Sequence, residues 1–411
     1  MHQERRPKLI RMPVYDVDDR PFMVIWETTN ACDLACRHCR AEAIAGVEPG
    51  TLTTEEGKRL LDQIEHFGRP RPIVILTGGD PFKRADLFEL VAYGTEIGLP
   101  VAVSPSGTPL LNRVNLQKLK DAGAKAISLS IDGSTPEIHD NFRRVPGSFD
   151  MTVSGWRDAL DVGLKVQLNT TVTRYNLDDL PNIFRLAQDI GVMTWSVFFL
   201  VPTGRGRVED EVTPQEYEDV MHWLYDASKL ASVKTTEGHH YKRVVLQRTL
   251  LDQMGLDPVE ALGLGGTYQR LHERFLQVAD FGNERYVQED RMRRSPMHIN
   301  AGNGFVFISR RGEVFPSGFM PVTAGSVREG SLVDIYREAP LFRELRRPDH
   351  FEGKCGRCEF RYVCGGARSR AYAVTGNPVA SEPFCTYEPG SFPYVEELEP
   401  FLQVPGQAAA D

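Results

Sequence analysis

Six short runs of hydrophobic residues recur in the first half of the chain, and stretches with helical spacing separate them. These runs are rich in β-branched and aromatic side chains, which are typical of buried parallel strands. They occupy residues 22–27, 73–77, 101–104, 126–131, 166–172 and 195–201. Between the first two, apolar residues from Leu60 to Phe67 recur at three- and four-residue steps, which predicts a helix over 53–67 capped by Thr53 or Thr54. Similar helices are expected over 85–97, 115–122, 151–162, 180–190 and 213–230.

This alternation of strands and helices predicts an α/β fold with a parallel sheet. Six strand-helix pairs are too few for a complete eight-stranded barrel, which typically takes ~250 residues. We therefore expect a partial (β/α)6 barrel of the TIM type. In such barrels the active site lies at the carboxyl ends of the strands.

The pattern changes after the sixth pair. Residues 234–298 are charged and irregularly helical with no strand signal, a hairpin is expected over 305–315, and a short helix over 332–337. We divide the chain into an N-terminal extension (1–20), a barrel (21–232), a helical bridging region (233–300), a C-terminal domain (301–400) and a flexible tail (401–411).

Composition and charge narrow the possible functions. The 411 residues are 41% hydrophobic and 25% charged, as in ordinary globular proteins. The net charge of −8 argues against nucleic acid as a partner. No apolar stretch approaches the ~18–20 residues of a membrane helix, and the N-terminus lacks the apolar core of a signal peptide. We expect a cytoplasmic protein without a membrane partner, in which thiols are more often metal ligands than disulfides.

All seven cysteines fall into two groups. Cys32, Cys36 and Cys39 form a C-x3-C-x2-C run directly after the first predicted strand. The second group has the spacing C-x2-C-x5-C-x20-C and consists of Cys355, Cys358, Cys364 and Cys385. Three thiolates can hold three irons of a 4Fe-4S cluster and leave the fourth iron open, whereas four thiolates close a cluster completely.

Zinc is the alternative metal that these thiols could bind. A structural zinc site needs four ligands, and in the first run the fourth would have to be His38, which lies between two of the cysteines. The second group alone also suits zinc, because thiolate softness does not separate zinc from iron-sulfur clusters.

The segment ETTNACDLACRHC (27–39) resembles the signature of the radical S-adenosylmethionine (radical SAM) superfamily. The second cysteine group, followed by GGARSRAYAVTGNP (365–378), is similar to the C-terminal iron-sulfur extension called SPASM or twitch. The cysteine spacing and the segment GEVFPSGF (312–319) resemble the radical enzymes of alternative heme and heme d biosynthesis, which trim propionates from iron tetrapyrroles.

This resemblance implies two 4Fe-4S clusters and S-adenosylmethionine as cofactors. The open-iron cluster on Cys32, Cys36 and Cys39 would cleave S-adenosylmethionine reductively to a 5′-deoxyadenosyl radical, with an external low-potential donor such as ferredoxin or flavodoxin. Ser317 and Ala367 stand where related proteins often have further cysteines, so one auxiliary cluster is expected. That cluster would serve as an electron conduit or as a structural clip.

The resemblance also implies which residues bind S-adenosylmethionine. They follow the second, fourth and fifth predicted strands, and comprise Gly78, Gly79 and Asp80 for the methionine amine, Ser130 and Asp132 for the ribose, Arg143 for the methionine carboxylate, and Asn169. Read without the resemblance, the Gly-Gly-Asp-Pro segment is a turn that ends a strand, and Asp132 is an ordinary Asp-Gly turn residue. Ser106 departs from the asparagine common in this family. His38 stands where the family has a residue packing near adenine, and we assign it no catalytic role.

Cations cluster in the bridging region. The members of this set are His239, His240, Lys242, Arg243, Arg248, Arg291, Arg293, Arg294 and His298. They suit an anionic ligand such as a tetrapyrrole propionate, or they form a solvated helix face.

Three functions remain after these observations. The first is hydrogen abstraction from a tetrapyrrole propionate leading to oxidative decarboxylation. The second is a peptide maturase that crosslinks or epimerises a ribosomally made peptide, although about twenty residues before the first strand are too few for a fused peptide-recognition domain. The third is a non-enzymatic iron-sulfur carrier or zinc scaffold, which has no use for an open-iron triplet inside a barrel.

Overall fold

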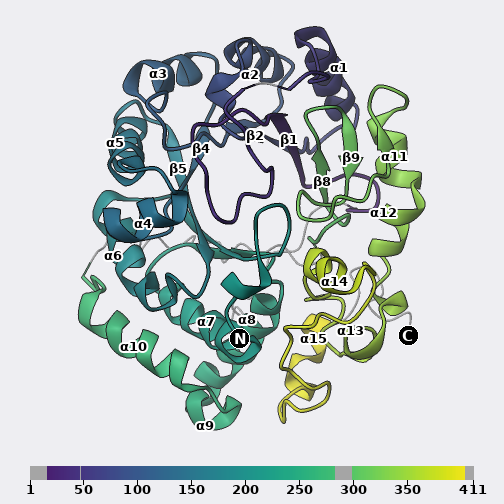
Figure 1. Ribbon diagram of the computed structural model, residues 1–411. Coiled ribbons are helices and arrows are strands. Elements are labelled where there is room, and N and C mark those ends of the chain that lie inside the picture. The colour runs from purple at the N-terminus through teal and green to yellow at the C-terminus, as the bar shows by residue number, and fades with distance from the viewer. Residues whose placement is uncertain (1–15, 47, 283–298, 403–411) are drawn as a thin grey trace, which may run out of the picture.

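The computed structural model describes residues 16–46, 48–282 and 299–402, and it contains one ten-stranded sheet (Figure 1). The sheet has the strand order β10-β9-β8-β1-β2-β3-β4-β5-β6-β7. The strands are β1 (Met23–Thr29), β2 (Ile73–Gly78), β3 (Val101–Val103), β4 (Ala126–Ser130), β5 (Lys165–Val172), β6 (Thr194–Phe199), β7 (Val233–Thr236), β8 (Phe305–Ile308), β9 (Glu313–Phe315) and β10 (Gly325–Ser326).

The six predicted strands are confirmed as β1 to β6, and they pair in parallel in chain order. The expectation of no strand within 234–298 is wrong, because β7 pairs in parallel with β6. Its sequence, VKTT, has only one apolar residue and so lacks the hydrophobic run that marks the other strands. This segment is a strand because it pairs with β6. The predicted hairpin is confirmed as β8 and β9, and β8 pairs in parallel with β1. The proposed bridging region and C-terminal domain thus both contribute strands to the barrel sheet.

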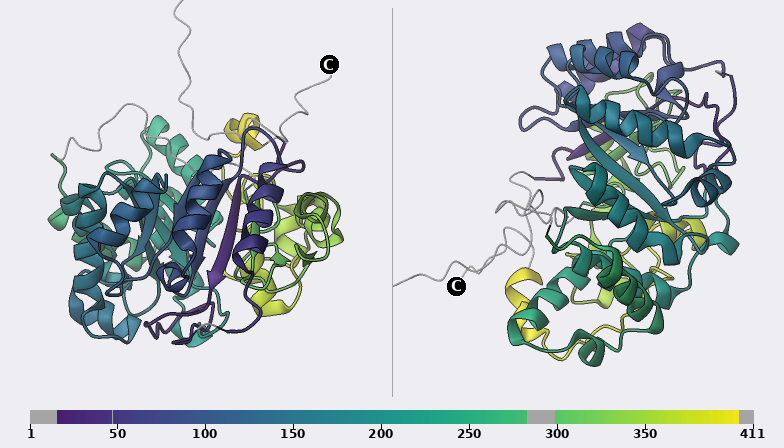
Figure 2. Two further views of the ribbon diagram at one scale, coloured as in Figure 1. Left: turned by 90° about the horizontal axis from the view of Figure 1, so that it is seen from above. Right: turned by 90° about the vertical axis from the view of Figure 1, so that its left-hand side faces the viewer.

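Helices follow the strands and cover the convex side of the sheet (Figures 1 and 2). Thr53 caps the first helix in a capping box with Glu56, as its position predicted. One helix, α4, was not predicted. The helices up to β7 are α1 (Thr54–Glu65), α2 (Leu87–Glu96), α3 (Arg113–Asp121), α4 (Pro136–Arg143), α5 (Ser148–Asp161), α6 (Leu180–Ile190) and α7 (Pro214–Ala227).

The concave face of the sheet differs from the convex face in polarity. Along β5, Val166, Leu168 and Thr170 are buried, whereas the alternating residues Gln167 and Asn169 are partly exposed. Strand β4 repeats this alternation with partly exposed serines. Because side chains alternate between the faces of a strand, the polar rows of β4 and β5 lie together inside the barrel.

Residues 305–402, which we call the C-terminal segment, pack at the edge of the barrel near β8 and against the helices that follow β7 (Figures 1 and 2). Helix α10 packs on α6 and α7, and α8 packs on α7. The predicted short helix is confirmed as α11. These later helices are α8 (His240–Met254), α9 (Pro258–Leu262), α10 (Gly266–Val278), α11 (Leu332–Glu338), α12 (Pro340–Leu345), α13 (Gly353–Arg357), α14 (Arg368–Thr375) and α15 (Glu399–Leu402).

Part of the predicted cation cluster, comprising Arg291, Arg293, Arg294 and His298, lies outside the described residues, as does most of the proposed tail. Within the described ranges, no helix is long and apolar enough to cross a membrane.

Candidate active site

The three N-terminal cysteines lie on one loop that follows β1. The loop is fixed at both ends by backbone hydrogen bonds: Cys32 N donates to Ile44 O at 2.7 Å, and Ala35 N donates to Arg143 O at 3.2 Å. Cys32 and Cys36 are buried, Cys39 is partly exposed, and all three are free thiols. The loop therefore presents three thiols at the carboxyl end of β1, where the barrel fold predicts an active site.

Each of the three sulfurs accepts a hydrogen bond from a nitrogen. Leu34 N lies 3.3 Å from Cys32 Sγ, Ala43 N lies 3.4 Å from Cys39 Sγ, and Arg143 Nη1 lies 3.5 Å from Cys36 Sγ. Burial raises the pKa of the Cys36 thiol, and Arg143 opposes that rise. N–H donors directed at cysteine sulfur suit iron-sulfur ligands, because they stabilise the thiolate charge. The donor set fits a 4Fe-4S cluster with one iron left open.

The glycine pair after β2 lies against the backbone that leads into the cysteine loop. Gly79 N donates to Thr29 O at 2.8 Å, and Asp80 N donates to Ala31 O at 2.7 Å. A Cβ on Gly78 would collide with Thr29 O, and one on Gly79 would collide with Ala31 O. Only glycine permits this close approach, so the pair sets the position of the first cysteine.

The Asp80 side chain is fully buried, and hydrogen bonds occupy both carboxylate oxygens. One oxygen accepts from the Thr108 hydroxyl at 2.7 Å, and the other from Phe82 N at 3.2 Å. Burial raises the pKa of Asp80. In this conformation Asp80 ties the loop after β3 to the end of β2, and its implied contact with a methionine amine stays a prediction.

Ser106, whose role the sequence left undefined, lies beside the first cysteine. Its hydroxyl donates to Gly79 O at 2.7 Å, and the Cys32 thiol donates to Ser106 Oγ at 3.6 Å. The serine thus links the glycine pair to Cys32. In the sequence, only the departure from the family's asparagine at position 106 could have drawn attention to this residue.

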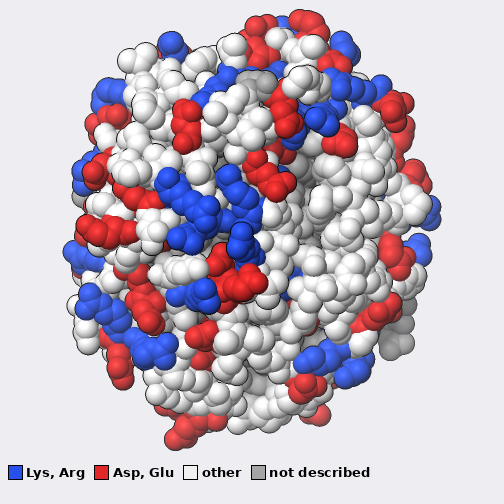
Figure 3. All heavy atoms as spheres, viewed as in Figure 1, with Lys and Arg blue, Asp and Glu red and all other residues white. Residues whose placement is uncertain are grey.

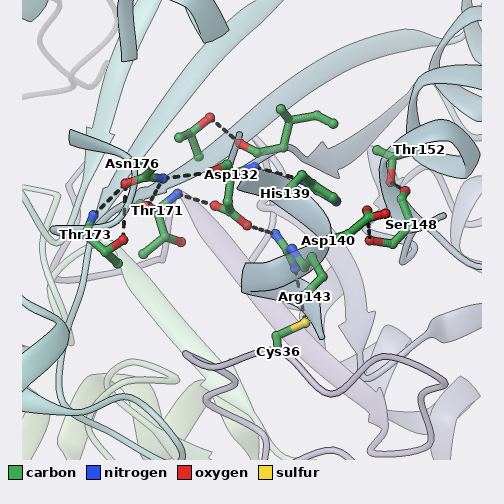
Figure 4. Close-up of polar contacts among 12 residues, drawn as sticks. Cys36, Asp132, His139, Asp140, Arg143, Ser148, Thr152, Thr171, Thr173 and Asn176 are labelled. Atoms are coloured by element: carbon green, nitrogen blue, oxygen red, sulfur yellow. Dashed lines mark hydrogen bonds and ion pairs between the residues drawn. The ribbon is translucent and has the colours of Figure 1, made fainter. Parts of the chain in front are cut away.

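Asp132 and Arg143 form a buried ion pair that reaches Cys36 (Figure 4). The Asp132 carboxylate also accepts from Thr171 N at 2.7 Å. Burial acts to raise the pKa of Asp132, but Arg143, the two nearby histidines His38 and His139, and the hydrogen bond from Thr171 N together hold that pKa below its usual range. The pair connects the ends of β4 and β5 to the cysteine loop through α4. The structure brings these two predicted site residues to each other, and their implied contacts with ribose and carboxylate stay predictions.

Ser130 and Asn169 are direct neighbours in the β4–β5 register and lie on the concave face. The Asn169 side-chain oxygen accepts a hydrogen bond from Gln167 Nε2 at 2.8 Å. Both side chains are partly exposed. They are placed where a bound molecule in the barrel could contact them, and that contact stays a prediction.

His38 stacks on Phe142 of α4, with ring centroids 4.6 Å apart and an interplanar angle of 20°. Burial lowers the pKa of His38 to about 4, so the ring is neutral near pH 7. The stack gives the cysteine loop a flat aromatic surface.

The four C-terminal cysteines line a single pocket that is partly open to solvent. Here too, nitrogen donors reach sulfur: Gly366 N lies 3.3 Å from Cys364 Sγ, and Arg368 Nη2 lies 3.3 Å from Cys355 Sγ. No group of three or more His, Cys, Asp and Glu side chains in the described ranges is placed to hold a single metal ion. In a 4Fe-4S cluster each thiolate binds a different iron, so four thiols around one pocket can hold that group.

The cations of α8 do not form a solvated helix face, and that alternative is wrong. Arg243 and Arg248 are 3% and 2% exposed. Arg243 pairs with Glu218 at 2.7 Å, and Arg248 pairs with Asp226 at 2.6 Å, both on α7. Helix α8 is covered by α7 and the C-terminal segment, and the carboxylates of α7 compensate the charges of these two arginines inside the protein.

Arginines that sequence reasoning missed gather beside the cysteine loop. Arg37 and Arg174 flank the Tyr175 ring at 5.3 and 5.1 Å from its centroid. Arg205, in the loop after β6, donates its backbone N–H to Cys39 O at 3.0 Å, and its Nε and Nη2 are buried without a hydrogen-bond partner. Arg40 lies 4.4 Å from the Phe307 ring centroid. We call Arg37, Arg40, Arg174 and Arg205 the mouth arginines. Figure 3 shows a gathering of Lys and Arg on this face beside a hollow.

Comparisons with known proteins show which family this chain is related to. The radical SAM superfamily matches residues 26–187. The AdoMet-dependent heme synthase of Methanosarcina barkeri is 39% identical over 90% of this chain and 97% of its own. The Fe-coproporphyrin III synthase of the same organism is 30% identical over 89% of this chain and 88% of its own.

The fold also recurs among solved structures. The crystal structure of Streptococcus suis SuiB bound to precursor peptide SuiA has a TM-score of 0.61 and 15% identity, and the match covers 90% of this chain and 76% of that one. At this identity the likeness concerns the fold alone.

Proposed function

The chain belongs to the radical SAM superfamily and is related along nearly its whole length to AdoMet-dependent heme synthases, and we propose that it decarboxylates propionates of an iron tetrapyrrole. Membership of the superfamily makes the chain an enzyme that uses S-adenosylmethionine and a 4Fe-4S cluster. The tetrapyrrole substrate is the proposal.

Cys32, Cys36 and Cys39 would hold the cluster with the open iron. When bound, that cluster supplies the electron that cleaves S-adenosylmethionine to a 5′-deoxyadenosyl radical. We assign S-adenosylmethionine to the carboxyl ends of the strands, next to Gly78, Gly79, Asp80, Ser130, Asp132, Arg143 and Asn169. The Asp132–Arg143 ion pair holds α4 against the cysteine loop, so these residues orient the cofactor and exclude water that would quench a radical.

The mouth arginines are the observation that carries the substrate assignment. The chain has a net charge of −8, yet four arginines gather beside the cysteine loop. Arg205 keeps two guanidinium nitrogens without a protein partner. Arginine binds carboxylates through two parallel hydrogen bonds. A macrocycle with several propionates matches this surface, and two relatives are named for heme and for Fe-coproporphyrin III.

The proposed reaction balances with a one-electron acceptor. Removal of one hydrogen atom from the propionate, then of one electron, releases CO2 and leaves a vinyl group. A cluster on Cys355, Cys358, Cys364 and Cys385 would be an acceptor of the iron-sulfur class. An external low-potential donor such as ferredoxin or flavodoxin would reduce the first cluster. Free thiols at both sites require a reducing compartment, which supports a cytoplasmic location.

The test is anaerobic turnover of reconstituted enzyme with S-adenosylmethionine, dithionite and Fe-coproporphyrin III, followed by mass spectrometry of the tetrapyrrole. We expect each converted propionate to lose CO2 and two hydrogens, with 5′-deoxyadenosine formed alongside. Arg205→Gln should raise KM for the tetrapyrrole, whereas Arg113→Gln, an exposed arginine on α3, should leave it unchanged. Deoxyadenosine without any change in the tetrapyrrole would contradict the proposal and favour a peptide substrate.

A further inference from the structure

A histidine that the proposed reaction leaves without a role lines the pocket of the four C-terminal cysteines. His240, the first residue of α8, is part of the pocket wall together with Cys355, Cys358, Cys364 and Cys385. Its side chain comes from a helix about one hundred residues before these cysteines, so no local spacing in the sequence links it to them.

The imidazole of His240 has no hydrogen-bond partner. The residue is 0% exposed, and both Nδ1 and Nε2 are buried without a partner. An imidazole carries at least one N–H donor in every protonation state. A buried N–H donor without an acceptor destabilises the folded protein, which indicates that a group in the pocket accepts this hydrogen bond.

The packing around the ring limits where that N–H can point. The Tyr217 ring contacts His240 edge-on with centroids 5.3 Å apart, and the Tyr217 hydroxyl is already bound to Glu237 O. Arg243, one turn further along α8, uses Nη1 on Gln247 and Nη2 on Glu218. The polar groups of Tyr217 and Arg243 are thus bound elsewhere, and His240 borders the pocket that the four cysteines line.

We propose that His240 donates a hydrogen bond to the auxiliary 4Fe-4S cluster and thereby raises the potential at which that cluster accepts an electron. Hydrogen bonds to cluster or cysteine sulfur stabilise the added negative charge of the reduced state. Arg243 adds positive charge on the same wall. This inference rests on the auxiliary cluster of the proposed function, and it makes α8 of the barrel part of the electron-acceptor site.

The first test isolates the auxiliary cluster in the full chain by replacing Cys32, Cys36 and Cys39 with Ala, and then measures its midpoint potential by EPR-monitored titration. We expect His240→Phe to lower the potential and His240→Gln, which retains an N–H donor, to restore most of it. His239→Phe is the matched control, because His239 precedes it on the same helix start and does not line the pocket. Equal potentials for wild type and His240→Phe, with iron content unchanged, would overturn the inference.

The second test needs no substitution at His240. With 15N-histidine in the same background, pulsed EPR of the reduced cluster should show a weak 15N coupling and an exchangeable proton. No coupling would overturn the inference, and a coupling large enough for a directly bonded nitrogen would replace the hydrogen bond by ligation. Iron content separates the two proposals: without an iron-sulfur cluster in this background both fail, whereas a normal cluster without histidine coupling refutes the role of His240 alone.

Discussion

The two cysteine sites of this protein are built in different ways. The N-terminal site takes its three thiols from one eight-residue loop, and its surroundings come from the ends of β1, β2, β4 and β5. The C-terminal site takes four thiols from residues 355–385 and is closed on one side by α8 of the barrel. Three thiols can hold three irons of a 4Fe-4S cluster and leave the fourth without a protein ligand, so we call the N-terminal site the open site. Four thiols can hold all four irons, so we call the C-terminal site the closed site, although its pocket is partly open to solvent.

This difference in construction matches a difference in task. The open site lies where the strands end, next to polar residues on the concave face and to the mouth arginines. The closed site lies where the C-terminal segment meets α7 and α8. We propose that the first site binds a molecule beside its metal group, and that the second exchanges electrons or holds the fold.

The largest effect is expected from loss of a cysteine of the open site. Cys36→Ala removes one of three ligands and the sulfur that Arg143 contacts. We expect 5′-deoxyadenosine formation to fall by at least about a thousandfold, because the radical chemistry belongs to the cofactor. Chromatography of reduced reaction mixtures measures it. Residual cleavage near the wild-type rate would contradict the assignment of this loop.

Loss of a cysteine of the closed site should separate cleavage of S-adenosylmethionine from formation of the tetrapyrrole product. Cys358→Ala is expected to leave S-adenosylmethionine cleavage measurable and to abolish tetrapyrrole product. Both compounds are quantified in the same turnover reaction. If cleavage and product disappear together, the C-terminal cluster is a structural clip rather than an electron acceptor.

A methyl group added at one glycine beside each cysteine site should disturb that site alone. A Cβ on Gly79 would collide with Ala31 O at the cysteine loop, and a Cβ on Gly366 would lie 3.1 Å from Cys355 Sγ. We expect Gly79→Ala and Gly366→Ala each to lose about half of the bound iron, from the nearer cluster only. Gly46→Ala, with nothing within 4 Å, is the control. EPR identifies the cluster that remains, and loss of both clusters in either variant would show that the sites are not independent.

The buried ion pair of the open site should contribute strongly to stability. Asp132→Asn leaves Arg143 buried without a counter-charge, which costs about 3–5 kcal/mol. Because the folded-state pKa of Asp132 lies below its ordinary value, the wild-type contribution is present above about pH 4 and is lost as the pH falls through that lowered pKa. Thermal unfolding from pH 3 to pH 8 measures both effects. Asp161→Asn, at an exposed pair with Arg113, should change stability by less than about 1 kcal/mol.

A smaller effect is expected where the barrel meets the C-terminal segment. Glu237 accepts hydrogen bonds from Ser317 at 3.2 Å and Ser369 at 2.9 Å, and burial raises its pKa to about 7. The folded protein therefore binds this proton more tightly than the unfolded chain, and stability falls as the pH rises from about 4.5 to about 7. Glu237→Gln should remove this loss, which amounts to at most about 3 kcal/mol. Melting curves of the wild type and of Glu237→Gln at pH 5 and pH 8 measure this loss. If the stability difference between the two proteins is the same at both pH values, the raised pKa of Glu237 is refuted.

Much of the fold could be predicted, because β1 to β6 coincide with hydrophobic runs and α1 begins at its capping threonine. Strand β7 could not, since VKTT becomes a strand only by pairing with β6. The cysteine groups were visible from spacing. The burial of α8 was not, because Glu218 and Asp226, which compensate its arginines, lie on another helix. The mouth arginines come from three loops, after β1, β5 and β6, that only the folded barrel brings together.

The most direct test of the two-site account is an iron count after anaerobic reconstitution of the wild type and of the Cys32/Cys36/Cys39→Ala variant, with deoxyadenosine assayed in both. The account predicts about eight irons falling to about four, with cleavage present only in the wild type. Zinc in place of iron at the C-terminal cysteines, or about four irons in the wild type and none in the variant, would contradict it.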